Sequence, residues 1–207
     1  MYLAIAGNIG AGKSSLTRIL AERYHLLPVF EAVDENPYLE DFYRDMHRYA
    51  FHSQMFFLAT RLEQHLWQVN PGERIIQDRT IYEDADIFAR NLYQEGIMAP
   101  RDFRSYMRMY EAIQQTLRPP DMLVYLKASL PTLRRHIALR GRPFETSLDD
   151  GYLARLNTLY QEWVSQYQLS ELVVIDTDAL DFVNSHSDLA RLLDTLERRG
   201  LTLPTLR

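Results

Sequence analysis

The chain has 207 residues, a formal net charge of −5 and no cysteine. This length suits a single α/β core, so we expect one domain over residues 1–207. The acidic balance argues against a nucleic-acid partner, and no apolar run reaches the ~18 residues that a membrane span needs. We expect no secretory leader, and the lack of cysteine excludes disulfides and thiolate metal sites; both are compatible with a cytoplasmic protein.

The first motif in the chain is a phosphate loop. Residues 7–15 match Gly-x-x-x-x-Gly-Lys-Ser, after an apolar run over 2–6 and before apolar residues at helical spacing. Strand, glycine loop and helix are the context in which backbone N–H groups hold the oxygens of a polyphosphate. The alternative is an ordinary glycine turn before a helix, which would rarely carry every fixed position of the motif. We expect this loop to bind a nucleoside triphosphate through Gly7, Asn8, Ile9, Gly10, Ala11, Gly12, Lys13, Ser14 and Ser15.

Along the rest of the chain, apolar strand-like runs alternate with longer helical stretches, which predicts an α/β fold with a doubly wound parallel sheet. The five expected strands cover residues 2–6, 27–30, 73–77, 121–127 and 171–176. After the helix that starts near Lys13, the expected helices cover residues 37–68, 81–95, 101–117, 131–140, 150–168 and 186–199. Asn36 and Pro37 would start the first of these, as a cap followed by a proline.

Two missing motifs argue against a GTPase switch. None of the eight glycines has an aspartate three residues before it, so Asp-x-x-Gly is absent. Neither Lys13 nor Lys127 follows an asparagine, so the guanine-binding Asn-Lys-x-Asp motif is absent as well. Arginine supplies all the other basic residues, and a single arginine is therefore weak evidence for function in this chain.

Polar residues follow the second and third expected strands. Glu31 comes directly after one strand, Asp78 and Arg79 come after the next, and Asp84 follows six residues later. In an open α/β sheet the carboxyl ends of the strands border the ligand crevice. An acid and an arginine there are better placed for chemistry than in the middle of a helix. Taken alone, Glu31 could equally be a solvated loop carboxylate.

Together these segments resemble the deoxynucleoside kinase family, and its bacterial purine-type members look nearest. The matching segments are the phosphate loop, Glu31 with residues 36–39, residues 52–61, residues 78–84 and a lid that begins with residues 140–145. Several independent segments in the right order make the resemblance specific, and it covers nearly the whole chain. It implies a P-loop fold with a five-stranded parallel sheet, flanking helices and an arginine-bearing lid at about residues 140–149. It also implies transfer of the γ-phosphate of ATP, bound with Mg²⁺, to the 5′-hydroxyl of a deoxynucleoside in nucleotide salvage.

The resemblance also assigns the chemistry to particular residues. The predicted catalytic residues are Glu31, Arg79, Lys13, Arg140 and Arg142. Glu31 would take the proton of the 5′-hydroxyl, and the cations would stabilise the transferred phosphate. Ser14 and Asp78 would hold Mg²⁺, while Asp181 and Phe182 match the loop that holds the adenine of ATP, as the least specific match. Cations near a helix C-terminus favour its dipole in any case, so the two lid arginines have a purely structural alternative.

The deoxynucleoside would lie against the second helix and the lid. The predicted substrate-binding residues are Glu31, Tyr43, Gln54, Arg61, Arg79, Asp84 and Glu145. By resemblance, Tyr43 and Glu145 hold the 3′-hydroxyl of deoxyribose, although Tyr43 could be a plain core aromatic. Gln54 and Arg61 lie two turns apart on one helix face, and the Gln54 amide can both donate and accept toward a base edge.

The choice of base depends on Asp84. An ionised aspartate only accepts hydrogen bonds, so it should face the amino group of adenine or cytosine rather than an oxygen of guanine or thymine. Arg61 could hold this carboxylate through two bonds, although the two residues could also form a structural pair away from the base. Relatives with this combination accept amino-bearing bases. We therefore predict deoxyadenosine as the main substrate, deoxycytidine as a second one, and a deoxyguanosine kinase as the alternative.

Two other classes of protein stay open at this point. A nucleoside monophosphate kinase would need several arginines for the acceptor phosphate and no carboxylate base, so an indispensable Glu31 argues against it. A non-catalytic ATP-binding protein would not need a base, a metal ligand and a lid together. The resemblance and the aromatic-rich residues 37–67 suggest a homodimer, although these aromatics could instead fill the core of one chain.

Overall fold

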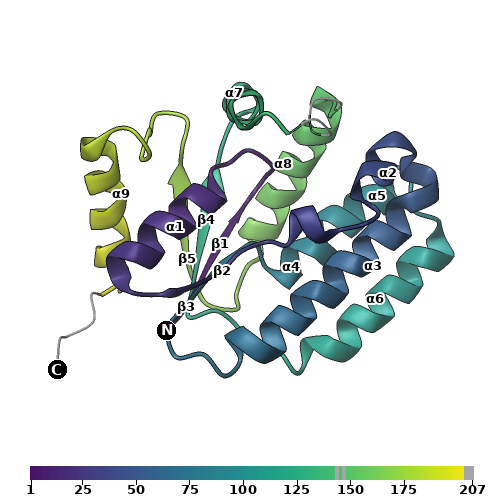
Figure 1. The fold of residues 1–207 in the computed structure, drawn as a ribbon, viewed down its shortest axis with the longest axis horizontal. Helices are drawn as coiled ribbons and strands as arrows, with labels where there is room; N and C mark the ends of the chain where they lie inside the picture. Colours follow the sequence, from purple (N-terminus) through teal and green to yellow (C-terminus); the bar gives the residue numbers. More distant parts are fainter. Residues whose placement is uncertain (143–144, 146–147, 203–207) are drawn as a thin grey trace.

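The structure, a computed structural model, describes residues 1–142, 145 and 148–202. Within these residues, five strands form one all-parallel sheet in the order β2-β3-β1-β4-β5 (Figure 1). The strands are β1 (Tyr2–Gly7), β2 (Leu27–Val29), β3 (Ile75–Asp78), β4 (Met122–Lys127) and β5 (Glu171–Asp176). The expected five-stranded parallel sheet is therefore confirmed, with small shifts at the strand ends.

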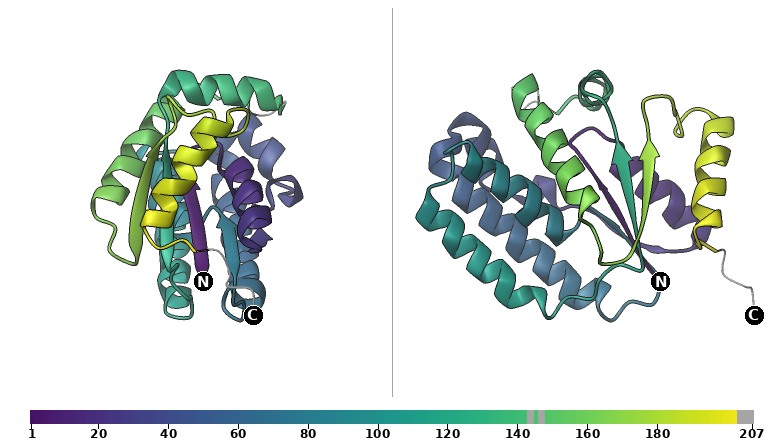
Figure 2. Two further views of the ribbon diagram at one scale, coloured as in Figure 1. Left: turned by 90° about the vertical axis from the view of Figure 1, so that its left-hand side faces the viewer. Right: turned by 180° about the vertical axis from the view of Figure 1, so that it is seen from behind.

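Helices cover both faces of this sheet, as the views in Figure 2 show from two further sides. One face carries α1 (Lys13–Tyr24) and α9 (His186–Arg198). The other face carries α3 (Met46–Gln64), α6 (Pro100–Gln114) and α8 (Asp150–Ser165), together with the short helices α2 (Leu39–Arg44), α4 (Ile81–Glu83) and α5 (Arg90–Gln94). Helix α7 (Leu130–Arg140) lies beyond the carboxyl ends of the strands, at the top of Figure 1.

Strand β1 contributes to two apolar cores, one on each face of the sheet. All of its residues are buried: Tyr2, Ala4 and Ala6 belong to the core beneath α3, α6 and α8, while Leu3 and Ile5 belong to the core beneath α1 and α9. Successive side chains of a strand point to opposite faces, so a sheet covered on both sides needs apolar residues throughout its strands. Polar residues are consequently left to the strand ends, where the functional side chains lie.

The expected helix over residues 37–68 is wrong in its start and its continuity. The Asn36 side chain accepts the Tyr38 backbone N–H at 3.0 Å and donates to Ser53 Oγ at 3.1 Å, but residues 37–38 form a turn and α2 begins only after Tyr38. Asp45 then interrupts the helix with φ −144° and ψ 84°, and its carboxylate accepts the Arg48 backbone N–H at 3.2 Å. Aspartate is a favourable N-cap because it satisfies a free backbone donor, so α3 starts anew at this residue.

Two wide π-helical stretches also depart from a regular α-helix. One, His65–Val69, continues α3, and the other, Asp84–Ala89, joins α4 to α5. Residues 81–94 are thus helical as expected, but with a local widening of a kind that is frequent at functional sites. No helix in residues 1–142 or 148–202 is both long and apolar enough to cross a membrane.

Candidate active site

A cavity of about 290 Å³ lies at the carboxyl ends of β1 and β3. Its wall contains all the predicted catalytic residues, both predicted metal ligands and every predicted substrate-binding residue except Arg61. These wall residues are Lys13, Ser14, Glu31, Tyr43, Gln54, Asp78, Arg79, Asp84, Arg140, Arg142 and Glu145. The volume is close to the lower end for sites that bind small molecules. The fold therefore brings together residues that are far apart in the sequence.

The phosphate loop leaves β1 at Gly7 and enters α1. Gly12 has a φ of 96°, and a Cβ there would lie 3.0 Å from the Phe182 ring, so neither the backbone nor the space suits a larger residue. The Asn8 side chain anchors the loop to α8, because its amide donates to the Leu153 carbonyl at 2.9 Å and to Asn157 Oδ1 at 2.8 Å. The loop is thus fixed by protein contacts before any phosphate binds.

At the start of α1, Lys13 provides a buried ammonium and Ser14 provides a hydroxyl that bonds a carboxylate. The Lys13 ammonium donates to the Asn8 carbonyl at 3.0 Å, and burial, followed by repulsion from Arg79, lowers its pKa to about 8. The Ser14 hydroxyl donates to Asp78 Oδ2 at 2.5 Å, and burial raises the pKa of Asp78. Asp78 Oδ1 is buried without a hydrogen-bond partner among the described residues. A hydroxyl and a carboxylate oxygen beside a phosphate loop form a donor set of the kind that Mg²⁺ shares with phosphates.

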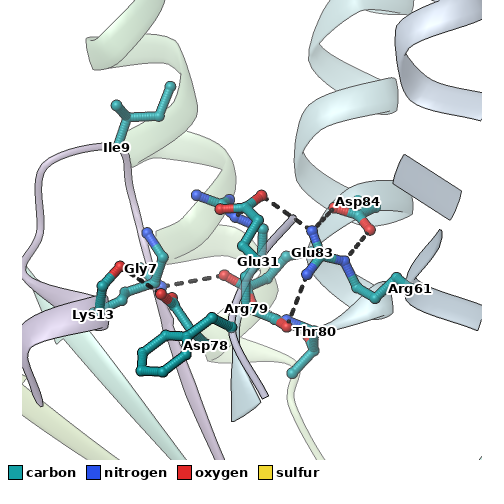
Figure 3. Close-up of polar contacts among 12 residues, drawn as sticks. Gly7, Ile9, Lys13, Glu31, Arg61, Asp78, Arg79, Thr80, Glu83 and Asp84 are labelled. Carbon is teal, nitrogen blue, oxygen red and sulfur yellow. Dashed lines mark hydrogen bonds and ion pairs between the residues drawn. The ribbon is translucent and has the colours of Figure 1, made fainter. Parts of the chain in front are cut away.

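Glu31 lies between two arginines (Figure 3). Its Oε1 is 3.0 Å from Arg61 Nη2 and 2.9 Å from Arg79 Nε. Burial alone would raise the pKa of Glu31, but attraction by Arg79, Arg61 and Lys13 outweighs burial and lowers the pKa to about 2. The side chain is 16% exposed and faces the cavity. Glu31 is therefore an ionised carboxylate held in place, and the alternative of a solvated loop residue does not fit.

Arg79 has a backbone conformation that few residues other than glycine adopt, with a φ of 68°. Its N–H donates to the Ile5 carbonyl at 3.0 Å, and its guanidinium carbon lies 4.3 Å from the centre of the Phe88 ring. Its Nη1 donates to the Tyr160 hydroxyl at 3.1 Å. Such backbone conformations persist where the surroundings fix them, and they cluster at functional sites. Here the conformation turns the side chain from the end of β3 into the cavity.

The predicted pairing of Asp84 with Arg61 is present (Figure 3). Arg61 Nε donates to Asp84 Oδ2 at 2.5 Å and Nη2 donates to Oδ1 at 3.3 Å, so the guanidinium holds the carboxylate through two bonds. Burial raises the pKa of Asp84 to about 6 against the attraction of Arg61. Asp84 lines the cavity, while Arg61, 2% exposed, lies behind it. On the same side of α3, Gln54 places a buried Oε1 that has no hydrogen-bond partner in the described part of the chain.

Arg140, at the end of α7, binds the carboxylate of Glu145. Its Nη2 and Nε donate to Glu145 Oε2 at 2.5 Å and 3.0 Å, and Arg142 Nη1 lies 3.6 Å from Glu145 Oε1. Tyr43 lines the same cavity, and burial raises its pKa. Other parts of the expected lid, residues 143–144 and 146–147, lie outside the described residues. The two lid arginines therefore line the cavity beside Glu145, and their role at the phosphate stays a prediction.

Asp181 and Phe182, the predicted adenine-binding residues, do not line the cavity. Phe182 is buried against Gly12 of the phosphate loop. Asp181 uses its carboxylate in its own turn, where Oδ1 accepts the Asn184 N–H at 3.0 Å. Their contact with adenine stays a prediction.

Glu83 and Tyr160, two buried residues beside the cavity, were not predicted from the sequence as part of the site. Glu83 accepts hydrogen bonds from Gly7, Thr80 and Tyr160. The Thr-x-x-Glu pattern at residues 80–83 is a helix-capping signal and could have pointed to Glu83. No local pattern marks Tyr160, which reaches the site from α8.

Comparisons with known proteins agree with this geometry. A family model described as deoxynucleoside kinase matches residues 3–199. The chain is 34% identical to the deoxyadenosine/deoxycytidine kinase of Bacillus subtilis, over 94% of this chain and 90% of that protein. It is 33% identical to the deoxyguanosine kinase of the same organism, over 92% of this chain and 93% of that protein.

A solved structure also matches over nearly the whole chain. The deoxyadenosine kinase from M. mycoides, with the products dCMP and dCDP bound, has a TM-score of 0.84 and 30% sequence identity to this chain. The match covers 97% of this chain and 100% of that one. Motifs, cavity and relatives agree over nearly the whole length, and the chain belongs to the deoxynucleoside kinase family, whose members are ATP-dependent kinases.

Proposed function

We propose that this kinase transfers the γ-phosphate of ATP mainly to the 5′-hydroxyl of deoxyadenosine, with deoxycytidine as a second substrate. The observation that carries the proposal is the carboxylate of Asp84, which lines the cavity while Arg61 holds it from behind. A carboxylate only accepts hydrogen bonds, and it has more acceptor positions than the two bonds to Arg61 occupy. Adenine and cytosine offer it an amino group, whereas guanine and thymine would face it with an oxygen.

The relatives support a deoxynucleoside as the substrate without choosing among the bases. One Bacillus subtilis relative is a deoxyadenosine/deoxycytidine kinase and another is a deoxyguanosine kinase, at nearly equal identity. The M. mycoides deoxyadenosine kinase was solved with the product dCMP. A deoxyguanosine kinase is thus the alternative, and Asp84 is the residue that argues against it. Family membership removes the other two classes, a nucleoside monophosphate kinase and a non-catalytic ATP-binding protein.

In the proposed reaction, Glu31 takes the proton of the 5′-hydroxyl. The bond from this oxygen to the γ-phosphorus forms while the bond from that phosphorus to the β-phosphate oxygen breaks. A carboxylate with a pKa of about 2 is a weak base, so the proton would move late, once attack has made the hydroxyl acidic. The two arginines on Glu31 keep its carboxylate ionised and aimed into the cavity.

The cations of the cavity would carry the rest of the catalysis. Lys13, Arg79, Arg140 and Arg142 line the space beside the phosphate loop, where the transferred phosphate would lie. Phosphoryl transfer depends mainly on positioning and on neutralising charge, which these side chains would supply. Ser14 and Asp78 Oδ1, which has no hydrogen-bond partner among the described residues, would hold Mg²⁺, which neutralises phosphate charge when bound. Tyr43, together with Glu145 beside Arg140, would bind the 3′-hydroxyl of the sugar.

The test is the initial rate with ATP, Mg²⁺ and each of the four deoxynucleosides, for the native protein and for Asp84→Asn. We expect the highest kcat/KM for deoxyadenosine and then deoxycytidine, with deoxyguanosine and thymidine lower by up to about 10⁴, because a mismatched polar group stays unpaired. Asp84→Asn should relax this preference, since an amide both donates and accepts. A higher kcat/KM for deoxyguanosine than for deoxyadenosine in the native protein would refute the interpretation of Asp84, while the kinase family would stand.

A further inference from the structure

The carboxylate of Glu83 is a buried centre of hydrogen bonds to which the reaction above gives no role. The residue is 0% exposed. Its Oε2 accepts the Thr80 N–H at 2.7 Å and the Thr80 hydroxyl at 3.0 Å. Its Oε1 accepts the Gly7 N–H at 3.2 Å and the Tyr160 hydroxyl at 2.8 Å. Both oxygens are therefore engaged, by groups from β1, from the turn before α4 and from α8.

Helix capping explains only half of these contacts. Thr80 and Glu83 form a capping box at the start of α4, and this box uses Oε2 alone. Gly7 and Tyr160, which bond Oε1, are 76 and 77 residues away in the chain. A fully buried carboxylate is costly unless it is well hydrogen-bonded. The capping box at the start of the helical residues 81–94 therefore leaves the two long-range contacts of Oε1 unexplained.

Tyr160 extends this network to Arg79. The Tyr160 hydroxyl lies 2.8 Å from Glu83 Oε1 and accepts a hydrogen bond from Arg79 Nη1 at 3.1 Å. The Gly7 carbonyl also lies 2.8 Å from this hydroxyl, so the single phenolic proton is donated to Glu83 or to Gly7. With either acceptor, an oxygen lone pair is left for the guanidinium. Arg79 is consequently held from two sides, by Tyr160 at Nη1 and by Glu31 at 2.9 Å from Nε.

The ring of Tyr160 is itself fixed. It is 0% exposed, stacks on Tyr125 of β4 at 5.6 Å and 18°, and meets the edge of Trp163 at 6.4 Å. Earlier in the same helix, Asn157 bonds the side chain of Asn8 in the phosphate loop at 2.8 Å. Helix α8 therefore contacts the phosphate loop through Leu153, Asn157 and Tyr160, and Tyr160 also bonds Arg79.

We propose that Tyr160, oriented by Glu83, is a positioning residue for phosphoryl transfer: it fixes the Arg79 guanidinium relative to Gly7, the first residue of the phosphate loop. The proposal rests on the catalytic role assigned to Arg79 above. A preorganised cation stabilises the transition state without having to be ordered at the moment of reaction. Tyr160 does not touch the reacting atoms, so its whole effect passes through Arg79.

The test removes the hydroxyl and keeps the ring. Tyr160→Phe should lower kcat about 10- to 100-fold, the effect of one hydrogen bond to a charged group. The KM for deoxyadenosine should stay within about twofold, because Tyr160 does not line the nucleoside site. In an Arg79→Lys background, which keeps the charge but loses the planar fork, Tyr160→Phe should change kcat by no more than about twofold.

A matched control separates this role from general stabilisation. Tyr24 is also fully buried, and its hydroxyl donates to Glu197 at 2.6 Å between α1 and α9, outside the cavity wall. Tyr24→Phe should lower Tm and leave kcat unchanged. Glu83→Gln is the second variant, to be used in particular if Tyr160→Phe does not fold; it keeps the shape of the side chain, loses its charge and should lower kcat in the same manner.

The kinetics of these variants decide whether Tyr160 positions Arg79 or only stabilises the fold. Native kcat with a lower Tm in Tyr160→Phe would make the residue purely structural and overturn the proposal. An equal loss of kcat in the native and Arg79→Lys backgrounds would also overturn it, because Tyr160 would then act independently of Arg79. Native kcat in Arg79→Lys alone would instead refute the proposed role of Arg79, which distinguishes the two failures.

Discussion

Lys13 should make ATP binding depend on pH above 8. Burial and then Arg79 lower the pKa of this lysine from 10.5 to about 8. Keeping the buried ammonium charged at neutral pH thus costs the free enzyme about 3 kcal/mol relative to water. The phosphates of ATP would restore the usual charge state, because an opposite charge nearby favours the ionised form.

The sign and size of the effect follow from proton linkage. With a pKa of about 8 in the free enzyme and the ordinary value of 10.5 restored in the complex, the complex holds more protons than the free enzyme between these pH values. Binding should therefore take up ~0.9 proton per ATP at pH 9 but only ~0.1 proton at pH 7. The Kd for ATP should rise nearly tenfold per pH unit above pH 8, up to about the pKa of the complex.

Calorimetric titration of the enzyme with ATP and Mg²⁺ measures this uptake directly. At pH 9, the apparent enthalpy should differ between two buffers by about 0.9 times the difference of their ionisation enthalpies. Lys13→Arg is the control, because a guanidinium stays charged at this pH and should bind ATP without proton uptake. Equal enthalpies in both buffers for the native protein, or unchanged uptake in Lys13→Arg, would refute the reasoning.

Three further predictions concern the base, the lid and assembly. Glu31→Gln should retain ATP affinity and lower kcat by about 10² to 10⁴, as expected for loss of a general base; near-native turnover at saturating substrates would remove Glu31 from the mechanism. Arg142→Ala should lower kcat by around 10³ with little change in the KM for deoxyadenosine, whereas intact kcat with a raised KM would contradict its role at the phosphate. Light scattering at micromolar concentration should give about twice the 24.4 kDa of one chain, and the mass of one chain would refute the homodimer.

The sheet and most helices could be predicted because the signals for them are local. The strands are mostly apolar, and glycine or proline separates many of the elements. The break at Asp45 was missed for the opposite reason. Its neighbours continue a helical pattern on both sides, and the cap becomes visible only in the contact from Asp45 to the Arg48 backbone. Local patterns thus established which elements exist better than where they end.

The residues of the site likewise divide into those that local motifs predict and those that only tertiary packing brings there. Lys13 belongs to the phosphate loop, whose chemistry can be predicted from its spacing, whereas the role of Arg79 was implied by the resemblance to the family; the fold places both in the cavity wall. Tyr160 belongs to no such motif, because its partners Gly7 and Glu83 are 153 and 77 residues away in the chain. An isolated tyrosine in an amphipathic helix is read as a core residue, and the position of its hydroxyl is decided only by tertiary packing.

Arg61 shows why residues behind the wall matter as much as those that face the ligand. It bonds Asp84 at 2.5 Å and Glu31 at 3.0 Å, so one guanidinium is the partner of both carboxylates. A buried charge that loses its partner is strongly destabilising, whereas a paired one can be kept. Since Asp84 is proposed to read the base and Glu31 to accept the proton, the two functions depend on the same side chain. Substituting Arg61 would therefore disturb recognition and chemistry together, although Arg61 itself does not line the cavity.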